Sequence, residues 1–61
     1  MQHPLAPVVR NTARGLLAYA RTGVGYEALN EKVNASARGL GVVPGWVWRE
    51  INELAEADRN G

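Results

Sequence analysis

The chain has 61 residues, no cysteine and a formal net charge of +1. A domain of this size buries only about 60% of the surface that its unfolded chain exposes, so dimerisation would be a simple way to enlarge its core. Without cysteine, neither a disulfide framework nor a thiolate metal site can form. No stretch approaches the roughly 20 apolar residues that cross a bilayer, and the N-terminus lacks the pattern of a secretory signal. We therefore expect one cytoplasmic domain that makes no use of a membrane.

The charges are distributed unevenly along the chain. Residues 1–26 contain three arginines and no acidic residue, whereas residues 27–61 contain four basic and six acidic residues. This asymmetry predicts one basic surface and one acidic surface.

The N-terminal part of the chain predicts a helix that follows a short lead-in. Residues 1–6 are expected to be flexible, and residues 7–61 to form a single domain. Pro7 favours the first turn of a helix, which predicts a helix over residues 7–22. Gly15 lies inside it, where glycine costs roughly 1 kcal/mol relative to alanine, so we expect a packing reason for it. The apolar face of this helix consists of Val9, Ala13, Leu16 and Ala20.

Three arginines form a basic stripe beside that apolar face. Arg10, Arg14 and Arg21 project within about 40° of one another on a helix. One interpretation is a solvated face whose aliphatic stems cover the edge of the core. The other is a phosphate-binding row, because aligned guanidinium groups with no nearby acid suit a polyanion.

A glycine-containing break separates the first helix from the second. Gly23 suits the residue after a helix C-terminus, and Gly25 can take the turn into the next helix. The sequence then predicts a short helix over residues 26–33, which needs tertiary packing because it is too short to be stable alone. The side chains expected to face inward from it are Tyr26, Leu29 and Val33.

Residues 34–43 are glycine-rich and less regular. Asn34 is a good N-cap, which predicts one extra helical turn over residues 35–38 before Gly39. Residues 41–43 are compatible with a short extended piece. The apolar residues expected to cover the open end of the core are Leu40, Val42 and Val43.

The C-terminal segment gives the clearest helical signal. Pro44 fits the first position of a helix, and good helix formers follow it, which predicts a helix over residues 44–58. Trp48 and Ile51 are expected at the centre of the core. The full apolar stripe consists of Val47, Trp48, Ile51, Leu54 and Ala55. Two earlier helices must cover this stripe, so the fold class is all-α, a compact three-helix domain that is helix-turn-helix-like.

Trp46 lies on the opposite side of the last helix. One interpretation is a first-turn residue that folds back over the preceding loop. The other is an exposed aromatic anchor for a protein partner, with Glu50 and Glu53 as its charged rim. The chain would then be a small helical adaptor or an inhibitor of the phage or prophage type. The same patch could instead pair with a second copy in a homodimer.

The sequence offers few residues that could act in catalysis. His3 is the only histidine, and no pair of nucleophile and base is visible. Neither a metal-ligand spacing nor a nucleotide-binding glycine motif is present. We therefore expect a non-enzymatic protein with no cofactor and no metal.

Three stretches, AYARTG, GYEALN and ASARGLG, lie between residues 18 and 41. They resemble the winged-helix DNA-binding part of alkyltransferase-like proteins, where a TYG-x-[IL]-A helix precedes a [SA]-x-R-x-[VL]-G recognition segment. The resemblance implies that Ser36 and Arg38 reach DNA. It does not imply alkyl transfer, because the catalytic cysteine motif is absent. The positions that match are Tyr26, Leu29, Arg38 and Gly41.

Two functions follow from these patterns. The first is a small DNA-binding module, whose weak and salt-sensitive contacts would come from Arg10, Arg14, Arg21, Lys32, Ser36 and Arg38. The acidic face of the last helix would be repelled by phosphates. The alternative is the protein-interaction module that uses Trp46, Glu50 and Glu53.

Overall fold

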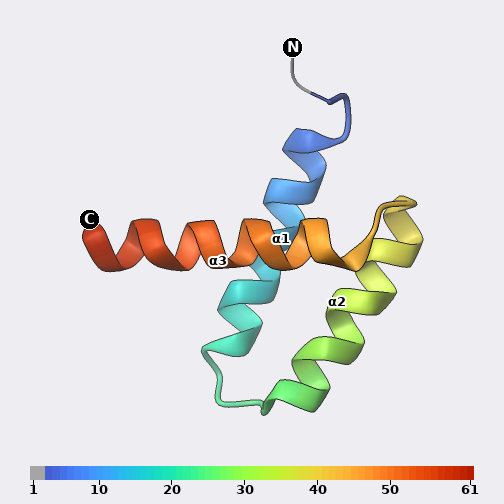
Figure 1. The fold of residues 1–61 in the computed structure, drawn as a ribbon. Helices are drawn as coiled ribbons and strands as arrows, with labels where there is room; N and C mark the ends of the chain where they lie inside the picture. Colours follow the sequence, from blue (N-terminus) through green and yellow to red (C-terminus); the bar gives the residue numbers. More distant parts are fainter. Residues whose placement is uncertain (1–2) are drawn as a thin grey trace.

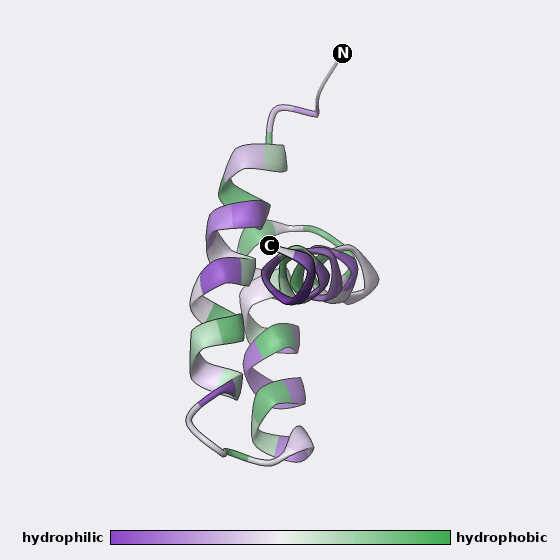
Figure 2. Ribbon diagram, turned by 90° about the vertical axis from the view of Figure 1, so that its left-hand side faces the viewer, coloured by the Kyte–Doolittle hydropathy of each residue, from purple (hydrophilic) through white to green (hydrophobic). Residues whose placement is uncertain are grey.

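Three helices make up the fold in the computed structural model, which describes residues 3–61. They are α1 (Ala6–Ala20), α2 (Tyr26–Leu40) and α3 (Pro44–Asn60). The helices α1 and α2 run antiparallel, and α3 crosses this pair (Figure 1). Seen along the axis of α3, the paired helices extend below the crossing (Figure 2). The predicted all-α domain of three helices is confirmed.

A small set of apolar side chains from all three helices forms the core. Val47 of α3 has no exposed surface, and Ile51, one turn later, is 4% exposed. The expectation that Ile51 lies at the centre is confirmed, but Trp48 is only half-buried and Val47 takes its place. Residue 48 lies about 100° round the helix from residue 47, at the edge of the stripe. The buried residues are Val9, Ala13, Leu16, Val33, Ala37, Val47 and Ile51.

The helix α2 is longer than the sequence predicts. We expected a helix over 26–33 and a separate turn over 35–38, but residues 26–40 form one uninterrupted helix. Val33 and Ala37 are both fully buried, one turn apart. Burial of this continuous apolar face outweighs the preference of Asn34 and Gly39 for ending or interrupting a helix.

Gly41 ends α2 and sets the direction of α3. Its φ of 74° is left-handed, and its N–H donates to the Arg38 carbonyl at 3.2 Å. The next N–H, of Val42, donates to the Ala37 carbonyl at 3.0 Å, which completes a helix-capping pattern that glycine favours. Residues 41–43 are therefore a capped connection: Gly41 is left-handed, and Val43 at its end has the extended backbone that was an alternative for the whole segment.

The other helix boundaries lie close to their predicted positions. Pro44 is the first residue of α3, as expected, and the helix continues to Asn60. The helix α1 begins at Ala6, and its preceding residue Leu5 packs against the core. Of the expected lead-in, Met1 and Gln2 lie outside the described residues. No described helix combines the length and the apolar character that crossing a bilayer requires.

Two apolar side chains that were expected to be covered are in solvent. Tyr26 is 70% exposed and Val43 is 68% exposed. Tyr26 lies in the first turn of α2, in the part of the α1–α2 pair that extends beyond α3 (Figure 1). Val43 is the N-cap of α3, where its backbone is extended. Leu29, Leu40 and Val42 pack against the core as expected.

Gly15 has no packing role in the structure. A Cβ atom added there would meet no neighbouring atom within 4 Å, and the residue is exposed. The expectation of a packing reason is therefore wrong, and this glycine only weakens α1.

Replacing Gly15 by alanine should stabilise the domain. We expect Gly15→Ala to raise the free energy of unfolding by about 1 kcal/mol, which is roughly 4–8 °C in Tm for a domain of this size. Gly41→Ala is the control with the opposite expected effect. It should lower the free energy of unfolding by about 1 kcal/mol or more, because an alanine at the left-handed φ of 74° is strained. Thermal unfolding followed by circular dichroism measures both, and a lower Tm for Gly15→Ala would contradict this account.

Candidate functional site

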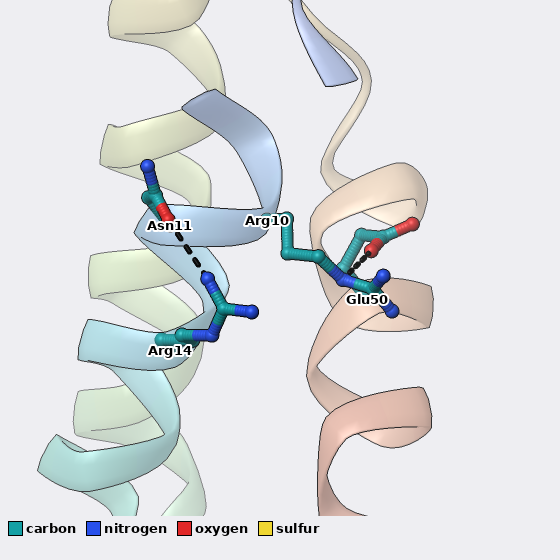
Figure 3. Close-up of polar contacts among 4 residues, drawn as sticks. All are labelled: Arg10, Asn11, Arg14 and Glu50. Carbon is teal, nitrogen blue, oxygen red and sulfur yellow. Dashed lines mark hydrogen bonds and ion pairs between the residues drawn. The ribbon is translucent and has the colours of Figure 1, made fainter. Parts of the chain in front are cut away.

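The arginine stripe of α1 faces acidic residues of α3. The Nε of Arg10 lies 3.2 Å from Oε1 of Glu50, and Nη2 of Arg21 donates to Oδ2 of Asp58 at 2.8 Å (Figure 3 shows the first pair). The first pair joins α1 to α3, and the second joins α3 to Arg21, the residue that directly follows α1. Two of the three predicted phosphate-binding arginines are thus neutralised within the domain, which favours the interpretation of the stripe as part of the fold.

Arg14 differs from the two arginines on either side of it. Its Nη1 donates to Oδ1 of Asn11 at 2.9 Å, within the same helix (Figure 3). No ion pair among the described residues involves it. Arg14 also lines two shallow clefts between α1 and α3. The first, of about 340 Å³, is lined by Ala6, Pro7, Arg10, Asn11, Arg14 and Glu50.

The remaining residues of the predicted DNA-binding set lie elsewhere. Lys32 places its Nζ 5.1 Å from the centre of the Tyr19 ring, a cation–π contact between α2 and α1. Ser36 lines the same shallow cleft as Lys32. Arg38 is exposed two residues further on, about 200° round the helix from Ser36. Ser36 and Arg38 therefore point to opposite flanks of α2.

The predicted protein-interaction set is largely occupied by contacts within the domain. Trp46 is half-buried, packs against the core, and meets the His3 ring edge-on at a centroid distance of 5.1 Å. This placement favours the interpretation of Trp46 as a residue that folds back within the domain, but the ring that it meets belongs to His3 and not to the preceding loop. The Glu50 side chain is 16% exposed and paired with Arg10, so of the three only Glu53 is exposed.

A stacked aromatic pair, with one ring exposed and the other half-buried, is a feature that the sequence does not predict. The rings of Tyr26 and Trp48 stack with centroids 5.6 Å apart and planes 18° from parallel. Tyr26 also lines an apolar cleft of about 410 Å³ at the turn between α1 and α2. The residues around this cleft are Ala20, Gly23, Val24, Gly25, Tyr26 and Leu29. Only the tertiary fold brings residues 26 and 48 together.

The structure and the comparisons with known proteins add no further chemistry. Among residues 3–61, no three His, Asp or Glu side chains gather closely enough to hold a metal ion. Comparison with protein-family models, curated proteins and solved structures finds no match.

The two ion pairs between α1 and α3 should differ in strength. Glu50 keeps 16% of its side chain exposed, whereas Asp58 keeps 60%. Because solvent screens exposed charges, we expect a coupling energy of about 1 kcal/mol for Arg10–Glu50 and less than about 0.5 kcal/mol for Arg21–Asp58. Double-mutant cycles with Arg→Gln, Glu→Gln and Asp→Asn, followed by urea unfolding, measure both. A stronger coupling for Arg21–Asp58 than for Arg10–Glu50 would contradict the expectation that the less exposed pair is the stronger one.

Proposed function

We propose that this chain is a non-enzymatic protein-interaction module that binds its partner through Tyr26, Trp48 and the adjoining apolar cleft. The observation that carries the proposal is the stacked pair, in which Tyr26 remains 70% exposed. An exposed aromatic ring that is already held in place loses little conformational freedom when a partner covers it.

The surroundings of the pair also suit a protein partner. Tyrosine and tryptophan are enriched among the residues that dominate binding energy, especially beside a pocket that a partner can fill. Leu29 and Val24 give the neighbouring cleft an apolar lining. The Tyr26 hydroxyl adds a polar group at the rim of this surface. A partner would therefore present an apolar side chain to the cleft.

DNA binding, the other function that the sequence predicts, has less support. The connection between α2 and α3 is short enough for a helix-turn-helix arrangement, but Glu53 and Glu56 are exposed on α3. Arg10 and Arg21 are paired with acidic residues of α3, and the Lys32 ammonium lies over the Tyr19 ring of α1. A polyanion would meet few uncompensated cations on any one face.

A comparison of two equally exposed side chains tests the proposal. Tyr26 and Val43 are 70% and 68% exposed, so neither alanine variant should unfold the domain. A partner is first captured from cells that express the chain and then purified. We expect Tyr26→Ala to weaken its binding by roughly 2 kcal/mol, about thirtyfold in Kd, while Val43→Ala leaves Kd within about twofold. Isothermal titration calorimetry measures the affinities.

The same variants distinguish the alternative. Equal losses for Tyr26→Ala and Val43→Ala would contradict the proposed contact surface. If the chain binds mixed-sequence duplex DNA tightly, and Arg14→Glu abolishes this binding while Tyr26→Ala keeps it, the function is nucleic-acid binding and the proposed protein interaction is wrong.

A further inference from the structure

A second surface, separate from the aromatic cleft, lies where α1 meets α3. The ion pair Arg10–Glu50 joins the two helices, and Arg21–Asp58 joins α3 to the residue that directly follows α1. Arg14 lies between the two arginines in the sequence. The row therefore holds three guanidinium groups against two carboxylates, which leaves one positive charge uncompensated. That charge is at Arg14, whose hydrogen bond goes to a neutral amide.

Arg14 keeps most of its binding capacity. A guanidinium has five N–H donors, and only Nη1 of Arg14 is engaged, by Asn11. Arg10 is paired through Nε, so its two Nη groups remain available. Arg10 and Arg14 line the same cleft of about 340 Å³, one helical turn apart. In Figure 3, the Arg10 side chain extends towards Glu50 of α3, whereas the Arg14 guanidinium lies in front of α1, hydrogen-bonded to Asn11.

We infer that Arg14, assisted by the Nη groups of Arg10, binds a single carboxylate group presented by an acidic peptide segment. Paired guanidinium and carboxylate groups form two parallel hydrogen bonds with favourable geometry. The flanking carboxylates limit the ligand to one charge. Glu50 lies 3.2 Å from the Arg10 Nε, and Asp58 lies 2.8 Å from the Arg21 Nη2. Both would repel the next phosphate of a nucleic-acid strand.

The second cleft of this surface supports the same assignment. It has a volume of about 230 Å³ and also includes Arg14. Its other lining residues are Leu17, Ala18, Arg21, Leu54 and Asp58. Arg14 thus belongs to both clefts, with an ion pair in each, and a carboxylate that enters either one meets this uncompensated cation.

The test follows the arginine Nε–Hε resonances by NMR at constant ionic strength. The probes are acetate, a hexapeptide with both ends capped that carries one glutamate among alanines, and a short oligothymidylate. We expect Arg14 and Arg10 to shift saturably with acetate and with the peptide. Arg14→Gln should raise the apparent Kd for the peptide by about tenfold, as expected for loss of a charge-assisted hydrogen-bond pair.

Arg38 provides the matched control. It is exposed on α2, and no ion pair among the described residues involves it. Arg38→Gln should leave the peptide Kd unchanged. Equal shifts at Arg38 and Arg14, linear shifts without saturation, or tighter binding of the oligothymidylate than of the peptide would each overturn the inference. Tyr26→Ala should not change peptide binding, so failure here and failure of the aromatic contact are separable.

Discussion

Burial of Val47 and Ile51 of α3 against the paired helices is the interaction on which this structure depends. Among residues 3–61 the buried core has seven members, and two of them are alanines. Full burial of one valine or isoleucine contributes about 1.5–3 kcal/mol, which is a large share of the stability of so small a domain. Ala13 and Ala37 have no exposed surface, so they allow α1 and α2 to approach their neighbours closely.

The surfaces of the domain follow from this packing. Once Val47 and Ile51 face inward, helical geometry places Glu50 on one flank of α3 and Trp48 on the other. Glu50 then reaches Arg10, and Trp48 reaches Tyr26. The arginine stripe and the aromatic pair are therefore consequences of how α3 crosses the pair (Figure 1). A change in that crossing would alter both surfaces together.

Local sequence signals predicted part of this structure. The 3–4 residue spacing of Val9, Ala13 and Leu16 identified the buried face of α1, and Pro44 marked the start of α3. The length of α2 was not predictable in this way. Asn34 indicated a new start, whereas tertiary burial of the residues before and after it keeps the helix continuous.

The candidate sites depend on contacts that local spacing does not contain. Arg10 and Glu50, like Arg21 and Asp58, are far apart in sequence and meet only after folding. Local spacing therefore predicts a row of arginines without acidic neighbours. Tyr26 was assigned to the core from its spacing with Leu29, although its position in the first turn of α2 leaves it uncovered.

The most direct test of the central packing compares two alanines of α1. Ala13 is fully buried, whereas Ala18 is exposed on the same helix. Urea unfolding should show that Ala13→Leu lowers the free energy of unfolding by about 1–3 kcal/mol, because the tight core has no room for the larger side chain. Ala18→Leu should change it by less than about 0.5 kcal/mol. Equal effects of the two substitutions, or a stabilised Ala13→Leu variant, would contradict the account.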